Sequence, residues 1–195
     1  SLRRQYWPLL ESREYLSELG RKVIKDRKDD RFYYNPRWSL SGDMLAVLST
    51  DGVEEHVDII RLGDGLRTER LTAGMRVGRF DYLTFGSGTV DWAPDGRTIA
   101  FVAKDGPRDE ILLWDVYGRR LRKTLHLPRL ELLESLAFAP DGRRLALVGT
   151  GFGQSDIYVL DTESGAVQQI TGTPQRDDFP AWSPDGRQLA FSSKR

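Results

Sequence analysis

The sequence predicts an all-β protein, a partial β-propeller of four-stranded antiparallel blades with a short helix before it. Three observations lead to this prediction. A ten-residue motif occurs four times without gaps, each copy joins a tight turn to an alternating apolar strand, and the first three copies continue into two more strand-like segments. The copies begin at Trp38, Trp92, Phe138 and Trp182, and their spacings of 54, 46 and 44 residues are close to the length of one propeller blade.

The turn inside the motif has a physical basis. Proline presets φ at the first corner, aspartate tolerates the second, and glycine adopts positive φ without steric cost. The Pro-Asp-Gly triplets at 94–96, 140–142 and 184–186 are therefore predicted to reverse the chain between two strands. The first copy has Leu-Ser-Gly at 40–42, so we expect the same turn there with less rigidity.

The strand after each turn is predicted from its period of two. Large apolar residues flank a fixed alanine, which is Ala46, Ala100, Ala146 or Ala190. Such alternation is typical of a β-strand, and alanine on the second face indicates that this face also packs closely. A third strand that opens with an acid and a polar fourth strand complete each blade. These strands are expected at 58–62, 110–114 and 156–160, and at 67–72, 121–125 and 167–171.

The motif copies also set the expected domain boundaries. Residues 1–21 are a helical segment or linker, in which leucines at helical spacing predict a helix at 8–19. Residues 22–195 hold the propeller repeats. The parts of this region are an outer closing strand at 22–25, blades at about 34–72, 88–127 and 134–171, and a half blade at 179–195, with an insertion at 74–88.

About three and a half blades do not close a ring, because propellers typically have four to eight. Either further sequence or a second chain would complete it, and we favour a fragment of a longer protein over a self-completing dimer. Unclosed blade edges would also favour self-association, since they present a bare sheet edge and an apolar face to water.

The fourth copy reads Trp-Ser-Pro-Asp-Gly-Arg-Gln-Leu-Ala-Phe-Ser-Ser at 182–193, and the third blade contains Asp-Ile-Tyr-Val-Leu-Asp at 156–161 and Gln-Ile-Thr at 169–171. Together they resemble the repeat of the TolB-like β-propeller family, and the resemblance covers about 22–195. It implies an exported, periplasmic module of the bacterial envelope that binds a protein or peptide. The family's fold alone does not identify that partner.

Two narrower resemblances support an alternative function. Propeller domains of prolyl-oligopeptidase-type peptidases contain similar repeats. Tyr6-Trp7-Pro8 and the segment 32–36 are also similar to large exported bacterial proteins in which a metallopeptidase-type domain precedes a TolB-like propeller. These resemblances imply an accessory propeller that docks or gates substrate for a peptidase domain encoded elsewhere.

Composition excludes several classes of function. Lysine plus arginine and aspartate plus glutamate both number 29, so no net field attracts nucleic acid or an anionic membrane. There is no cysteine, no apolar run long enough to span a membrane and no signal peptide within this segment. A catalytic role is not expected either. His56 and His126 lie in different repeats without a metal-binding motif, and no Gly-x-Ser-x-Gly element occurs.

Some polar and glycine-rich segments have competing interpretations. The glycine-rich segment 149–153 opens no helix, so it is interpreted as a strand connection and not as a phosphate loop. The basic residues at 119–123 are interpreted as a solvated edge strand. No cofactor is expected, although acids entering the inner strands, namely Asp29, Asp30, Asp177 and Asp178, could line the axial opening and hold Ca²⁺. A sugar- or metal-binding propeller is a third hypothesis.

The partner-binding surface is predicted on one face of the propeller. The loops between second and third strands and the loops that enter the inner strands share this face, while the Pro-Asp-Gly turns mark the opposite face. The loops lie at 49–57, 103–109 and 149–155, and at 26–35, 73–87, 128–134 and 172–178. The residues predicted to contact a partner are Asp29, Asp30, Arg31, Phe80, Tyr82, Arg108, Phe152, Arg176, Asp177 and Asp178.

Overall fold

The computed structural model describes residues 32–50, 55–62, 67–71, 82–83 and 89–194, which all lie in one compact unit, Arg31–Arg195. The helix predicted at 8–19 and the closing strand predicted at 22–25 lie outside these residues. Within the described ranges, the structure contains no helix with the length and apolarity needed to cross a membrane.

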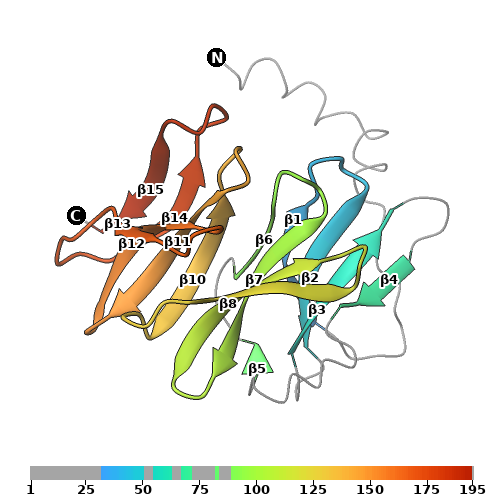
Figure 1. The fold of residues 1–195 in the computed structure, drawn as a ribbon, viewed down its shortest axis with the longest axis horizontal. Helices are drawn as coiled ribbons and strands as arrows, with labels where there is room; N and C mark the ends of the chain where they lie inside the picture. The colour runs from blue at the N-terminus through green and yellow to red at the C-terminus, as the bar shows by residue number, and fades with distance from the viewer. Residues whose placement is uncertain (1–31, 51–54, 63–66, 72–81, 84–88, 195) are drawn as a thin grey trace, which may run out of the picture. The chain divides into compact units, whose positions relative to one another are not determined.

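The described residues form fifteen strands in four antiparallel sheets (Figure 1). Blade A consists of β1 (Phe32–Trp38), β2 (Met44–Thr50), β3 (Glu55–Arg61) and β4 (Arg67–Arg70). Blade B consists of β5 (Tyr82–Leu83), β6 (Val90–Trp92), β7 (Thr98–Asp105), β8 (Arg108–Asp115) and β9 (Arg120–His126). Blade C consists of β10 (Leu132–Phe138), β11 (Arg144–Gly151), β12 (Gln154–Asp161) and β13 (Val167–Gln169), and blade D of β14 (Asp177–Trp182) and β15 (Leu189–Ser193).

The sheets confirm the predicted fold class. In blades A and C, the strands pair in chain order, and in blade B both β5 and β6 pair with β7, so that they share the inner position of a four-stranded blade. The inner strands β1, β6, β10 and β14 contact one another in that order. This radial sequence of sheets, each made from consecutive strands, is that of a propeller.

The aspartate of the motif stabilises the turn through backbone hydrogen bonds. Asp95 Oδ1 accepts from the N–H groups of Arg97 (2.8 Å) and Thr98 (2.7 Å), and Asp141 accepts from the two equivalent N–H groups at 2.9 Å. The glycine of the turn has a positive φ of 61° to 73° in all four copies. The first copy therefore keeps the turn without proline, as predicted; there Gly42 N–H donates to the Ser39 carbonyl at 3.0 Å.

The fixed alanines of blades A, B and C pack inside the protein, whereas Ala190 of blade D is exposed. Ala46, Ala100 and Ala146 are completely buried. Ala46 belongs to an apolar core shared by blades A and B, which includes Trp92 and Trp114, and Ala100 belongs to a second core between blades B and C. Both faces of a blade are therefore buried, which explains the small residue on the second face.

The structure corrects the predicted alignment of the third strands. Leu62, Val116 and Thr162 each donate their N–H to the carbonyl of the residue before the second strand, so these three positions are equivalent. Counting back along the strands from these positions makes His56, Glu110 and Asp156 equivalent. The sequence pattern instead aligns Asp58 with Glu110 and Asp156. The sequence pattern predicts the wrong register because the equivalent position of β3 holds His56, and the nearest following acid, Asp58, lies two residues further on.

The motif tryptophan joins one blade to the preceding one. Trp92 Nε1 donates to the Arg37 carbonyl at 3.1 Å, and Trp182 Nε1 donates to the Ala137 carbonyl at 3.0 Å. Each bond connects the inner strands of successive blades. The recurrence of tryptophan in this motif is thus explained by a polar contact between blades as well as by apolar packing.

The third copy has phenylalanine in place of tryptophan and uses a different contact. The Phe138 N–H donates to Asp91 Oδ2 on the inner strand of blade B at 2.7 Å. Asp91 also lies 3.9 Å from Arg37 Nε on blade A. One carboxylate thereby connects the inner strands of three blades. Burial raises the pKa of Asp91 to about 6, although the Phe138 N–H and Arg37 partly oppose this.

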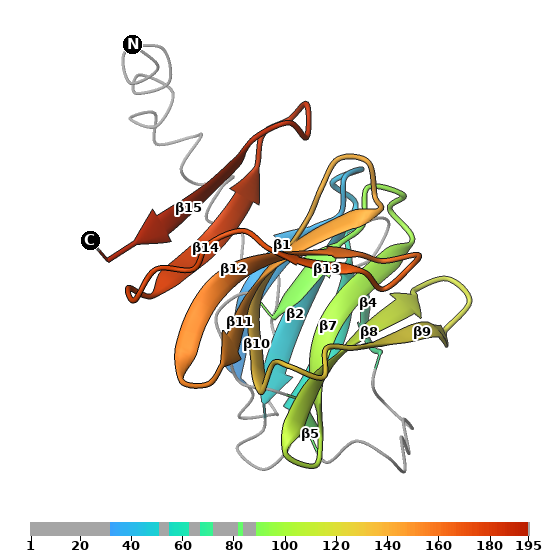
Figure 2. The same cartoon turned by 60° about the vertical axis from the view of Figure 1, so that its left-hand side comes forward.

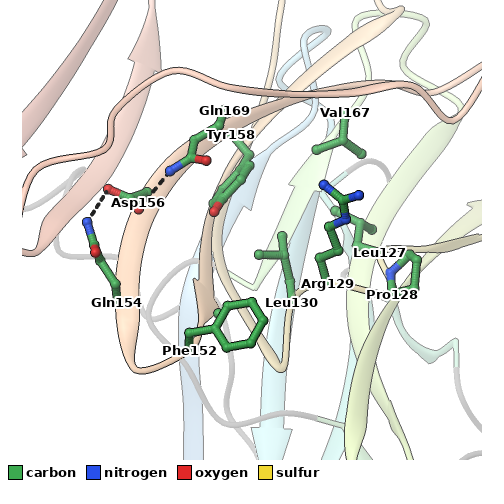
Figure 3. Close-up of a pocket in the computed structure, with 11 residues that line it drawn as sticks. Leu127, Pro128, Arg129, Leu130, Phe152, Gln154, Asp156, Tyr158, Val167 and Gln169 are labelled. Carbon is green, nitrogen blue, oxygen red and sulfur yellow. Dashed lines mark hydrogen bonds between the residues drawn. The ribbon is translucent and has the colours of Figure 1, made fainter.

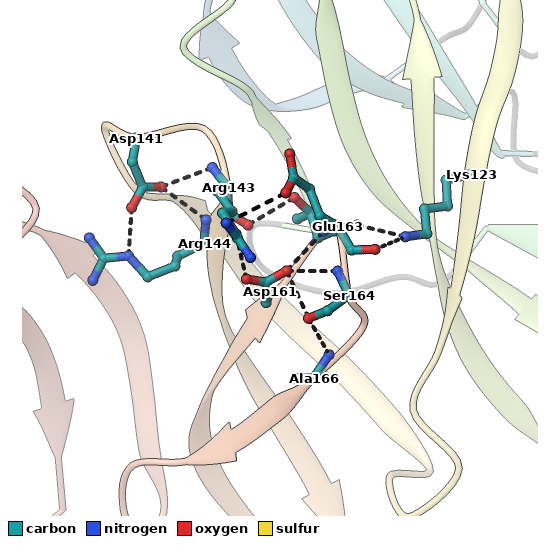
Figure 4. Close-up of polar contacts among 9 residues, drawn as sticks. Lys123, Asp141, Arg143, Arg144, Asp161, Glu163, Ser164 and Ala166 are labelled. Carbon is teal, nitrogen blue, oxygen red and sulfur yellow. Dashed lines mark hydrogen bonds and ion pairs between the residues drawn. The ribbon is translucent and has the colours of Figure 1, made fainter.

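The basic segment 119–123 was interpreted as a solvated edge strand, and β9 is indeed the outer strand of its sheet, with the Arg119 side chain 68% exposed. Two charges of this segment also contact neighbouring blades. Arg119 Nε, just before β9, lies 2.8 Å from Glu69 Oε1 on blade A. Lys123 Nζ donates to the Thr162 carbonyl at 3.0 Å and to the Glu163 carbonyl at 2.5 Å, on the turn between β12 and β13 (Figure 4). These charges connect blade B to both of its neighbours.

The inner strands share an irregularity that the sequence does not reveal. Strands β1, β10 and β14 each carry a register shift that begins four residues before the motif aromatic residue. One residue in each bulge, Asn35, Ser135 or Phe179, has a positive φ between 51° and 56°. A bulge bends the strand and re-aims side chains, and it is over-represented next to functional sites.

The indole bond between blades A and B can be tested by replacing Trp92 with phenylalanine. Trp92 and Trp114 are 6% and 8% exposed, but the Trp114 Nε1 atom has no hydrogen-bond partner among the described residues. Trp114→Phe is therefore a matched control for lost apolar area. We expect Trp92→Phe to lower the free energy of unfolding by about 1 kcal/mol more than the control does, measured by chemical denaturation. Equal losses would show that the indole bond contributes nothing.

The carboxyl group of Asp91 should make stability depend on pH. Its pKa of about 6 in the folded protein exceeds the unfolded value of about 3.9, so its contribution is complete below pH 4 and is lost as pH rises through 6. Asp91→Asn keeps an acceptor for the Phe138 N–H. The free energy of unfolding of this variant, relative to that of the parent, should rise by about 2–3 kcal/mol between pH 4 and pH 7.5, measured by urea denaturation. A difference that does not change with pH would contradict this assignment.

Candidate partner-binding face

The loop connections lie at one end of the blades and the motif turns at the other, as predicted. Figures 1 and 2 show the β7–β8 and β11–β12 hairpins at the end opposite the motif turns. The linker between β9 and β10 reaches the same end, because the Glu131 N–H donates to the Thr150 carbonyl at 2.8 Å. We call this end the loop face.

A pocket of about 670 Å³ lies on the loop face, between the linker and the outer strands of blade C (Figure 3). One part of its lining is apolar and consists of Leu130, Phe152, Tyr158 and Val167, together with Leu127 and Pro128. A second part is polar and consists of Gln154, Asp156, Gln169 and Arg129. An apolar pocket with a few convergent polar groups is the usual form of a binding site.

Phe152 forms the rim of the pocket and is 98% exposed. It lies at the tip of the β11–β12 hairpin with a φ of +53°, followed by Gly153 at +78°. Two positive φ values suit a tight hairpin turn, but Asn, Asp or Gly normally supplies the first of them. A bulky residue in this backbone region is uncommon. Phe152 is therefore costly both in backbone conformation and in exposed apolar surface.

Two glycines determine the shape of the pocket wall. A Cβ atom at Gly149 would lie 2.5 Å from Leu130 Cδ1, and one at Gly151 would lie 2.7 Å from the Arg129 carbonyl oxygen. Only glycine allows the linker to approach β11 this closely. The glycine-rich segment 149–153 is thus a strand connection, as predicted, and its composition serves the contact with the linker.

Asp156 lies on the polar side of the pocket and is 3% exposed. Its Oδ2 atom accepts from Gln169 Nε2 at 3.0 Å, and its Oδ1 atom lies 3.4 Å from Gln154 Nε2 and 3.3 Å from Thr171 Oγ1. Burial, and then the charge of Asp156, raise the pKa of Tyr158. The pocket therefore joins an aromatic surface to a buried carboxylate.

The structure describes only part of the predicted contact set. Asp29, Asp30, Arg31 and Phe80 lie outside the described residues. Tyr82 is on β5, but its side chain is also outside them. Arg108 and Phe152 are exposed at the two hairpins of the loop face. Partner contact by these residues stays a prediction.

Arg176 and Asp178 are brought together, but in an ion pair within the protein. Arg176 Nε lies 2.7 Å from Asp178 Oδ2, and Arg176 NH2 lies 2.9 Å from Glu134 Oε2 on blade C. This contact spans blades C and D. It gives both residues a structural role whether or not they also contact a partner.

Asp177 is completely buried, and within the part of the chain that the structure describes neither of its carboxylate oxygens has a hydrogen-bond partner. It pairs in register with Ser193, whose hydroxyl also has none. The equivalent residue of blade C, five positions before the motif aromatic residue, is the fully buried Leu133. Asp177 thus places a carboxylate where the neighbouring repeat has an aliphatic core residue.

Most residues that line the pocket were not predicted from the sequence. Arg129 and Leu130 of the linker are far in the sequence from Tyr158 and Gln169 of blade C, and only the fold brings the two pairs together. Asp156 was noticed as the acid that opens a strand. A comparison of the residues opposite it in the outer strands would have drawn attention to it.

Among the described residues, no group of three or more His, Asp or Glu side chains could hold a metal ion. His126 Nδ1 pairs with Glu110 Oε1 across β8 and β9, so this histidine has a structural partner. Calcium binding at the axial opening by Asp29, Asp30, Asp177 and Asp178 stays a prediction, since the first two lie outside the described residues.

These repeats, with their indole contacts between blades and their loop-face pocket, define a β-propeller of the type that presents loops for binding. The family model described as the TolB β-propeller domain matches residues 87–195. The chain therefore belongs to the TolB β-propeller family.

Known proteins match the chain over various lengths. An uncharacterized protein of Agrobacterium fabrum is 38% identical over 162 residues, which is 82% of this chain and 50% of that protein. The uncharacterized peptidase YuxL of Bacillus subtilis is 41% identical over 64 residues, 30% of this chain and 10% of the peptidase. The Tol-Pal system protein TolB of Desulfosudis oleivorans is 31% identical over 101 residues, 44% and 23% of the two chains. The chain thus spans half or less of the length of these relatives.

Solved structures show the same fold. TolB from Acinetobacter baumannii superposes with a TM-score of 0.68 and 23% identity, over 87% of this chain and 39% of that one. A puromycin hydrolase superposes with a TM-score of 0.62 and 18% identity, over 83% and 25% of the two chains. At these identities the likeness establishes the architecture alone.

Replacing Asp177 with leucine should stabilise the protein. The variant removes a buried carboxylate without partners and repeats the residue found at Leu133, so we expect a gain of about 1–3 kcal/mol in the free energy of unfolding. The adjacent Asp178→Asn, which breaks an ion pair with Arg176, is the control and should lose at most about 1 kcal/mol. Thermal and urea denaturation give both values. A destabilised Asp177→Leu would mean that a group not identified here satisfies the carboxylate.

Proposed function

We propose that this chain is a non-catalytic β-propeller scaffold that binds a protein or peptide partner through its loop face. The observation that carries this proposal is Phe152. This residue is 98% exposed in an unfavourable backbone conformation, and it lies on the rim of a partly apolar pocket. Aromatic residues of this kind are enriched in protein interfaces because they bury a large area on binding.

We further propose that the protein acts in the bacterial envelope, as an exported or periplasmic component. Its similarity to Tol-Pal system proteins supports this location. Exposed blade surfaces are also available for self-association. Trp38 on β1 and Phe179 on β14 are both 59% exposed.

The second candidate is an accessory propeller that docks or gates substrate for a peptidase domain. The similarity to an uncharacterized peptidase over 64 residues favours it. The loop face would then contact the catalytic domain or its substrate. Both candidates require the same surface and differ in what lies against it.

Site-specific photo-crosslinking distinguishes the candidates and tests the surface. A photoreactive amino acid replaces Phe152 on the loop face or, as control, Leu40, which is 78% exposed in a motif turn at the opposite end. We expect adducts from position 152 and none from position 40 in the source cells. An exported protein in the adduct supports the scaffold, and a peptidase domain supports the accessory role. Adducts from position 40 alone would contradict the assignment of the loop face.

A further inference from the structure

The blades provide an internal comparison for the carboxylate in the pocket. Glu110 of blade B is equivalent to Asp156 of blade C, since Ala103 pairs with Glu110 as Gly149 pairs with Asp156. Both acids are nearly buried, at 6% and 3% exposure. In blade B, the outer strand places His126 directly opposite Glu110, and the imidazole contacts the carboxylate. The buried acid of blade B thus has a neighbour that can carry positive charge.

The outer strand of blade C offers no such neighbour. Asp156 receives hydrogen bonds from Gln154, Gln169 and Thr171, which are all neutral. In the described ranges, no lysine, arginine or histidine nitrogen lies within 4 Å of the Asp156 carboxylate. Burying a carboxylate costs free energy that hydrogen bonds from neutral donors offset only in part, and buried charges are therefore normally paired with an opposite charge. The carboxylate of Asp156 therefore lacks a counter-charge at the point where it lines a pocket.

The remainder of the pocket suits a long basic side chain. Tyr158 and Phe152 provide aromatic surface and Leu130 provides aliphatic surface next to Asp156 (Figure 3). The stem of lysine or arginine packs on such surface while its charged head reaches a polar group, and the cation gains further from an aromatic face. Arg129 also lines the pocket, but its guanidinium points toward Val167 and away from Asp156.

We infer that this pocket binds a lysine or arginine side chain of a protein partner, with Asp156 as the counter-charge and Phe152 and Tyr158 against the stem. The inference rests on the proposed function, since it assigns a side-chain chemistry to the partner of the loop face. Arg129 makes an acidic side chain the competing occupant, and the experiment separates the two.

The test uses small probes and the full chain. Nα-acetyl-lysine methylamide and Nα-acetyl-arginine methylamide are titrated while the side-chain amide resonances of Gln154 and Gln169 are followed by NMR. The norleucine analogue, which has a similar stem without the charge, and the glutamate analogue are the controls. We expect the basic probes to bind with dissociation constants in the millimolar range, as is usual for ligands of this size. The norleucine probe should bind about tenfold more weakly.

Two variants identify the counter-charge. Asp156→Asn keeps the shape of the side chain and should weaken the lysine probe about tenfold. Thr171→His copies the arrangement of blade B and should weaken the same probe at pH 5.5, where the imidazole is charged, but much less at pH 8. Unchanged backbone amide spectra show that each variant is folded. The second variant keeps the test decisive if the first does not fold.

Several results would overturn the inference. They are equal binding of the norleucine and lysine probes, preferential binding of the glutamate probe, no binding of any probe, or wild-type affinity in Asp156→Asn. None of these bears on whether position 152 crosslinks to a protein. The pocket assignment can therefore fail while the proposed function stands, and a chain that forms no loop-face adduct can still bind the lysine probe.

Discussion

The small alanine in the second strand of blades A and B sets the distance to the neighbouring blade, and the rest of the structure depends on that distance. Ala46 is completely buried in the same core as Trp92, so the next blade approaches closely enough for the indole to reach the Arg37 carbonyl. A larger side chain at Ala46 would separate the inner strands and break this bond. The pocket forms at the next junction along the chain, where the linker after β9 lies against blade C.

Local features of the fold could be predicted from the sequence, and features that depend on two blades could not. The turn at 140–142 and the strand after it follow from proline, glycine and a period of two, which act within a few residues. The contacts of Lys123 were not predicted, because its acceptors at Thr162 and Glu163 lie in the next blade. The register of β3 was misjudged for a related reason, since only hydrogen bonds to the neighbouring strand show that His56 is equivalent to Glu110.

The candidate site divides in the same way. Phe152 was predicted as a contact residue because it lies in the loop between the second and third strands at 149–155, and the structure places it on the rim of a pocket. Asp177 and Asp178 were both predicted to line the axial opening and to contact a partner, because they are neighbours in a loop that enters an inner strand. Successive residues of a strand point to opposite faces, and one of these acids is completely buried while the other pairs with Arg176.

The bulges of the inner strands bear on how such a protein can change its specificity. Asn35, Ser135 and Phe179 differ in size and polarity, yet all adopt nearly the same left-handed backbone conformation. The surrounding sheet therefore dictates the geometry, and the side chain at this position is left free to vary. Successive repeats can therefore carry different side chains on their inner strands without any change in the framework, so divergence at these positions would alter the local chemistry and leave the architecture intact.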